Sequence, residues 1–179
     1  MGGFSAQHVA NVVWSFAKLG EYPGGGVLEA IFERIPYAFN SSSNPQDVAN
    51  TLWGCATLGV RPGEGALEAL RVRACQLVGG FNAQALSNTV WAYATLGVSP
   101  GAELLDGLVA RCLEVNEDLA PQAVANSLWA FAALDGEALK KVLVALCGQA
   151  LRHLEEGDLS ESHIQQVHQC LLYAELVVG

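Results

Sequence analysis

The chain has 179 residues, of which 51% are hydrophobic and 15% charged, and its formal net charge is −9. This much apolar surface supports a packed core and excludes a disordered tail. The acidic balance disfavours a general phosphate-binding surface, which would depend on Lys and Arg, and no apolar run reaches the roughly 18 residues that span a bilayer.

A pattern of Gln, Asn and Trp recurs four times along the chain. The Asn positions are separated by 39, 38 and 38 residues, and the Trp positions keep the same steps. The recurring residues are Gln7, Gln46, Gln84 and Gln122; Asn11, Asn50, Asn88 and Asn126; and Trp14, Trp53, Trp91 and Trp129. A fixed period of this length is typical of repeat architectures.

Each repeat is predicted to contain two helices. The first helix that carries the pattern ends at Gly20, Gly59 or Gly97, because Gly takes the left-handed conformation that closes a helix. Asn44 and Pro45 suit the N-cap and first helical position, and Ala120–Pro121 begins the fourth repeat similarly. The second helices are expected at 25–39, 63–78, 102–116 and 136–154, and a further helix, ESHIQQVHQCLLYAELVV, follows Gly157–Asp158.

These elements predict an all-α, right-handed α-solenoid in one domain, 1–179. The repeats cover about 4–42, 43–80, 81–118 and 119–157, and 158–179 forms a terminal half-repeat or cap. A helical projection at 100° per residue, drawn for the first helix of the second repeat, divides its residues into three groups. The core stripe contains Val48, Ala49, Leu52, Cys55 and Ala56. A row along its edge contains Gln46, Asn50, Trp53 and Thr57. The far face contains Asp47, Thr51 and Gly54.

The row has two interpretations that the sequence leaves open. Trp can fill the seam between repeats while Asn satisfies neighbouring backbone groups, and Ala49, Gly54 and Ala56 let helices approach closely. Alternatively, the amides hold an extended polymer and the aromatic rings stack on its bases.

The pattern Gln-x-x-Ala-Asn-x-x-Trp-Ala-x-Ala-x-Leu-Gly resembles the octotricopeptide repeat proteins and the repeat arrays of RAP-domain proteins. The matching segments are Gln7–Gly20, Gln46–Gly59, Gln84–Gly97 and Gln122–Leu134. Ser87 replaces the Ala of the pattern, and Asp135 replaces the final Gly. The resemblance implies an organellar protein, in a chloroplast or mitochondrion, that binds single-stranded RNA along the concave face of a helical solenoid.

Candidate binding residues are the amides and the variable positions of the far face. They are Gln7, His8, Asn11, Gln46, Asp47, Asn50, Thr51, Gln84, Asn88, Thr89, Gln122, Asn126 and Ser127. Lys18 is the one Lys or Arg expected on a first helix, which weakens the case for RNA. The alternative function is a protein-interaction scaffold in a large organellar assembly, without direct RNA contact.

No catalytic residue, metal site, cofactor or membrane insertion is predicted. His163, His168 and Cys170 lack metal-ligand spacing on one helical face. Cys55 takes the position of Phe16, Tyr93 and Phe131 in the other repeats, which predicts a core residue, and the five Cys without a CxxC pair favour reduced thiols.

The ends of the chain are expected to be covered. Phe4, Val9, Val13 and Phe16 lie on the first helix, and Leu176–Gly179 ends the chain on apolar residues. Because terminal repeats need polar outer faces, we expect either a segment of a longer protein or a subunit whose ends pack against further repeats or partners.

Overall fold

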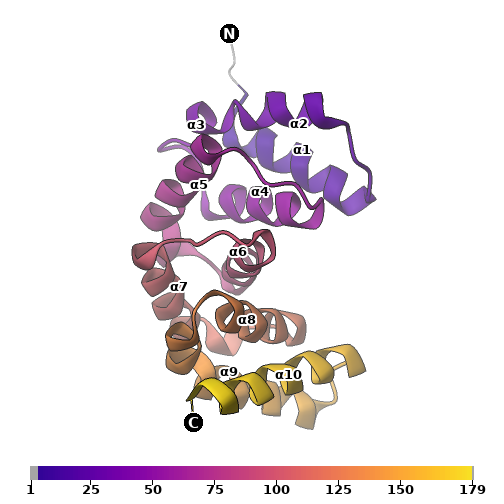
Figure 1. The fold of residues 1–179 in the computed structure, drawn as a ribbon, viewed down its shortest axis with the longest axis vertical. Coiled ribbons are helices and arrows are strands. Elements are labelled where there is room, and N and C mark those ends of the chain that lie inside the picture. The colour runs from indigo at the N-terminus through magenta and orange to yellow at the C-terminus, as the bar shows by residue number, and fades with distance from the viewer. Residues whose placement is uncertain (1–3, 179) are drawn as a thin grey trace.

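The protein, described over residues 4–178 by a computed structural model, is helical and has no strand in that range. Its helices lie in two layers (Figure 1). The first layer contains α1 (Ala6–Leu19), α4 (Pro45–Thr57), α6 (Ala83–Leu96), α8 (Pro121–Leu134) and α10 (Glu161–Val178). The second contains α2 (Gly25–Phe32), α3 (Ile35–Ala38), α5 (Glu64–Leu77), α7 (Ala102–Glu114) and α9 (Gly136–Glu156). Short 3₁₀ turns follow α5 (Val78–Gly80) and α7 (Asn116–Asp118).

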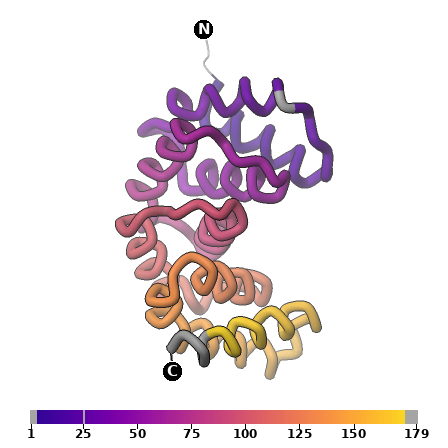
Figure 2. The backbone as a smooth tube through the Cα atoms, in the orientation of Figure 1, coloured from indigo at the N-terminus to yellow at the C-terminus, as the bar shows by residue number. Residues whose placement is uncertain are grey.

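Within each layer, successive helices pack side by side. In the first layer α1 contacts α4, α4 contacts α6, α6 contacts α8, and α8 contacts α10. In the second, α3, α5, α7 and α9 contact one another in that order. The chain therefore advances along the long axis, with α1 and α10 at opposite ends (Figure 2). One continuous core, from Ala6 to Cys170, lies between the layers and between successive helices.

The predicted helix boundaries are confirmed where capping chemistry is strong. Asn44 is the N-cap of α4, and its side-chain oxygen accepts the Asp47 backbone N–H at 3.0 Å. Gly20, Gly59 and Gly97 follow the first helices with φ of 67°, 66° and 63°. Because these values lie in the left-handed region, a residue with a Cβ would be strained there.

Asp135 closes one helix and begins the next. It is the C-terminal cap of α8 and the N-cap of α9, where its carboxylate accepts the Glu137 and Ala138 N–H groups at 2.7 and 3.3 Å. The replacement of the pattern's Gly therefore shortens the turn between α8 and α9 to a single residue, with its own cap.

The predicted helix at 25–39 is wrong as one element, because it is broken between α2 and α3. Pro36 has no N–H to donate to the Phe32 carbonyl, which interrupts the helical hydrogen-bond ladder at this point. The short α3 begins after Arg34, which makes no side-chain capping bond, and has Pro36 in its first turn. The other second helices lie close to their expected ranges.

Close packing of α1 on α4 depends on Gly54. A Cβ at this position would lie 2.7 Å from Val13 Cγ1 and 3.1 Å from the Val13 carbonyl carbon and oxygen. The prediction that Gly54 permits close helix approach is therefore confirmed. Among the described residues, no helix combines the length and apolar character needed to cross a membrane.

Candidate functional site

The recurring amides are accessible on the first layer. Gln7, Gln46, Gln84 and Gln122 are exposed, Asn11 is exposed, and Asn50, Asn88 and Asn126 are half-buried. Part of this row borders an open groove of about 470 Å³. We call it the Trp–amide groove; it is lined by Trp14 and Lys18 of α1, Trp53 of α4, Gln84 and Asn88 of α6, and Gln122 and Asn126 of α8. The structure thus brings together side chains from four first-layer helices. Gln7, Asn11, Gln46 and Asn50 are not among its lining residues.

The four Trp side chains are less buried than a seam role requires. Trp14 is 38% exposed, and Trp53, Trp91 and Trp129 are half-buried. Trp91 and Trp129 pack against the core with part of the indole. The prediction that Trp fills the seam between repeats is therefore only partly right, because each ring also presents surface to solvent.

Lys18 lies between two of these indoles. Its ammonium nitrogen is 5.6 Å from the Trp14 ring centroid and 5.0 Å from that of Trp53, so it makes cation–π contacts with both. Lys18 and Trp14 are four residues apart on α1, a spacing that places them on the same helix face. This spacing was visible in the sequence, but the contact with Trp53 of the next repeat was not.

The prediction that the far face of the first helices is exposed to solvent is wrong. Asp47, Thr51, Thr89 and Ser127 are at most 6% exposed, and Gly54 is also buried. Each internal first helix packs against one first helix before it and another after it, and the helical projection allowed for only one core stripe. These four candidate binding residues therefore cannot contact a ligand without unpacking the layer.

Two of the candidates are helix caps. The Asp47 carboxylate accepts the Asn44 N–H at 3.0 Å, which completes a capping box. His8 accepts the Ser5 N–H through Nδ1 at 3.1 Å, and its ring stacks on Phe4 with centroids 5.5 Å apart. Both side chains are thus used to begin helices.

Cations of the second helices hold the start of the first helix in their own repeat. Arg73 of α5 donates through Nη2 to the Ser43 carbonyl at 2.6 Å and through Nε to Ser43 Oγ at 2.9 Å. Arg111 of α7 donates through Nε to the Phe81 carbonyl at 2.6 Å. Ser43 and Phe81 both directly precede an N-cap, and we call this interaction the carbonyl clamp.

The fourth repeat replaces the arginine of the carbonyl clamp. Gln149 stands 38 residues after Arg111, and the corresponding carbonyl is that of Leu119. His153 Nε2 lies 2.8 Å from this oxygen, and Gln149 Nε2 donates to it at 3.4 Å. Two weaker donors on successive turns of α9 therefore take over the role of one guanidinium.

Most other cations are paired with neighbouring acids. The pairs are Arg61–Glu64, Arg71–Glu68 and Lys140–Glu137 at 2.7 Å, Lys141–Asp106 at 3.1 Å, and Arg152–Glu117 at 3.8 Å. The hydrogen bond from Arg71 lowers the pKa of the Glu68 carboxyl. Such exposed pairs contribute little to stability, but they place these cations outside the Trp–amide groove.

Cysteine chemistry is suppressed by burial. Cys55 is fully buried, as predicted, and burial raises its thiol pKa to about 12. Burial likewise raises the pKa of Cys112 to about 12 and that of Cys170 to about 11. Because the thiolate is the reactive form, these three residues behave as small apolar side chains near neutral pH.

Comparison with protein-family models gives no match for this chain, and a search of curated proteins finds no significant relative.

Proposed function

We propose that the chain is a right-handed α-solenoid of four helix pairs and a terminal helix that binds single-stranded RNA in the Trp–amide groove. The observation that carries the proposal is the composition of the groove, which brings the indoles of Trp14 and Trp53 together with the amides of Gln84, Asn88, Gln122 and Asn126 on one layer. Side-by-side packing of successive first helices supports the solenoid. The organellar location implied by the resemblance belongs to the same proposal.

The residue types suit unstacked bases. Gln84, Asn88, Gln122 and Asn126 carry both donors and acceptors, which can pair with the Watson–Crick edge of a splayed base. Trp14 and Trp53 offer exposed indole surface, and every base has a face that can stack on it. A base that stacks there displaces the Lys18 ammonium from the rings, which leaves that cation free to meet a phosphate.

Few phosphates can be neutralised in this groove. Among its lining residues in the described chain, Lys18 is the one Lys or Arg and Asp118 is a carboxylate. Each neutralised phosphate contributes about −0.7 to the log–log salt slope of single-stranded binding, so one or two contacts give a slope of about −1. We expect recognition to rest on stacking and amide hydrogen bonds, with a shallow salt dependence.

Filter binding of single-stranded RNA at two salt concentrations tests this proposal. Gln84→Ala and Gln122→Ala should each weaken binding about fivefold, the equivalent of one neutral hydrogen bond. Trp53→Ala should weaken it about tenfold through lost stacking. Gln46→Ala is the matched control. It removes an exposed amide of the same kind from α4, at a position that does not line the groove.

A protein-interaction scaffold is the second candidate function, and the negative net charge of the chain favours it. The chain carries a net charge of −9, and most of its arginines are used in the carbonyl clamp or in ion pairs. No detectable binding to a random single-stranded RNA pool, or equal loss of binding in Gln46→Ala and Gln84→Ala, would reject the RNA proposal and leave this one.

A further inference from the structure

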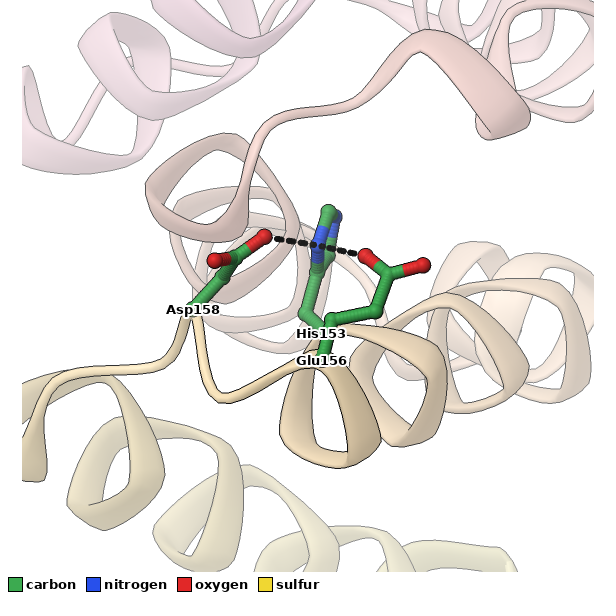
Figure 3. A group of neighbouring side chains, drawn as sticks. All are labelled: His153, Glu156 and Asp158. Carbon is green, nitrogen blue, oxygen red and sulfur yellow. Dashed lines mark ion pairs between the residues drawn. The ribbon is translucent and has the colours of Figure 1, made fainter.

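Three potential metal ligands converge where α9 ends. His153 and Glu156 lie on the last turn of α9, and Asp158 lies in the loop that leads to α10 (Figure 3). The His153 Nδ1 atom is 3.8 Å from Glu156 Oε2 and 3.9 Å from Asp158 Oδ2. The ligand atoms of all three side chains lie within 4.8 Å of one another.

The neighbours of Nε2 favour one tautomer of the imidazole. His153 Nε2 lies 2.8 Å from the Leu119 carbonyl oxygen, which can only accept, and 3.2 Å from Gln149 Nε2, and a hydrogen on His153 Nε2 satisfies the shorter of these two contacts. In the neutral ring Nδ1 then has a lone pair. This atom is buried, has no hydrogen-bond partner among the described residues, and faces the two carboxylates.

We infer that His153, Glu156 and Asp158 bind a divalent cation of the Zn²⁺ class. In a typical metal-binding histidine, the second ring nitrogen donates its N–H to a backbone carbonyl, a carboxylate or water. Imidazole and carboxylate ligands together suit first-row cations such as Zn²⁺ and Co²⁺, whereas Mg²⁺ and Ca²⁺ prefer oxygen ligands alone. Three protein ligands leave at least one coordination position for water.

The ligand separations need only small adjustments. Two atoms bound to one tetrahedral Zn²⁺ at about 2.0–2.2 Å lie about 3.4 Å apart. The Nδ1 separations of 3.8 and 3.9 Å therefore have to shorten by a few tenths of an ångström, and the two carboxylates, which lie within 4.8 Å of each other, have to approach further. The Glu156 and Asp158 side chains are 63% and 57% exposed, so they can rotate toward a common centre while His153, which is 12% exposed, stays in place.

A cation here would connect three segments of the chain. His153 ties the site to the loop before α8 through Leu119, Glu156 belongs to the end of α9, and Asp158 precedes α10. Binding to the folded chain alone stabilises it by an amount that grows with the logarithm of free cation. The melting temperature should therefore rise with added Zn²⁺.

Calorimetric titration of the 179-residue chain with ZnCl₂ tests the site. Wild type should bind one equivalent. Glu156→Gln and Asp158→Asn, which remove only a charged ligand at an exposed position, should each weaken binding about tenfold or more. Glu155→Gln is the matched control, because it removes the same charge from the same exposed turn without removing a ligand, and it should bind as wild type does.

His153→Gln separates metal binding from the structural role of this residue. Its amide nitrogen can still donate to the Leu119 carbonyl, but nothing replaces Nδ1. We expect a chain with unchanged helical circular dichroism that no longer binds Zn²⁺ and no longer melts at higher temperature when Zn²⁺ is added. Full Zn²⁺ affinity in this variant, or equal loss in Glu155→Gln, would overturn the proposal.

Cobalt distinguishes this site from the thiols. Bound Co²⁺ should show ligand-field bands without the near-ultraviolet charge-transfer band that a Cys ligand adds. Absence of Zn²⁺ and Co²⁺ binding to the wild-type chain would mean that the metal proposal is wrong.

Discussion

The two helix layers use their polar residues in opposite ways. In the first layer, small buried residues such as Gly54 and Thr51 close the contact between helices, while amides face outward. In the second layer, arginines reach across to a backbone carbonyl at the start of the first helix. Close packing at Gly54 thus brings α1 against α4, whereas arginine hydrogen bonds tie α5 and α7 of the second layer to the starts of α4 and α6.

The largest expected effect comes from breaking the carbonyl clamp. Arg73→Met removes the donors to the Ser43 carbonyl and hydroxyl, and bonds of this charged kind contribute about 1.5–3 kcal/mol. We expect about 3 kcal/mol less free energy of unfolding, measured by urea denaturation. Arg71→Met is the control, because Arg71 pairs with exposed Glu68 and should change stability by less than about 0.5 kcal/mol. Equal effects of the two changes would mean that the clamp contributes nothing specific.

The same substitution at two glycines tests whether shape closes the first layer. Gly54→Ala forces a Cβ against Val13 and should cost about 2 kcal/mol. Gly148→Ala on α9 adds a Cβ in open space and should gain about 0.5–1 kcal/mol from helix propensity. Thermal melts should therefore shift in opposite directions, and a stabilised Gly54→Ala chain would contradict close packing of α1 on α4.

Trp substitutions should cost less than core substitutions. A fully buried Trp replaced by Ala loses about 3–5 kcal/mol, but Trp53 and Trp91 are half-buried. We expect about 1.5–2 kcal/mol for each, and less for Trp14, measured by chemical denaturation. A loss above about 4 kcal/mol for Trp53 would show that the ring belongs to the core and would remove it from the list of stacking surfaces.

Thiol labelling should distinguish half-buried from fully buried cysteines with the smallest perturbation. Cys75 and Cys147 of the second layer are half-buried, whereas Cys55 of the first layer is fully buried with a pKa of about 12. Mass spectrometry after brief alkylation of the native chain should find Cys75 and Cys147 modified before Cys55. Early labelling of Cys55 would mean that the first layer opens locally.

The sequence was most informative where one residue decides a local conformation. Asn44 and the closing glycines predicted helix ends correctly because a cap depends on a few neighbouring atoms. The projection onto one helix failed for Asp47 and Thr51 because their burial depends on how many helices surround α4. Pro36 could have predicted the break between α2 and α3, because its missing N–H acts locally.

The candidate sites were predictable only in part. The repeat spacing identified Gln84, Asn88, Gln122 and Asn126 as related positions, but the groove also required the positions of Trp14 and Trp53 in space. Arg73 and Arg111 keep the 38-residue step, a signal that could have indicated a structural role. The His153 cluster gave no such signal, since it joins a helix end, a loop and a carbonyl 34 residues away.

The carbonyl clamp also bears on how such a chain can change its length in evolution. Arg73 and Ser43 belong to one repeat, as do Arg111 and Phe81, so donor and acceptor are always encoded together. Gene duplication or deletion of a whole 38-residue unit therefore leaves no orphaned arginine and no unpaired carbonyl, whereas loss of a segment that contains Arg73 but not Ser43 leaves that carbonyl without its donor. Insertions and deletions that give stable chains should thus comprise whole 38-residue units, each with its own donor and acceptor.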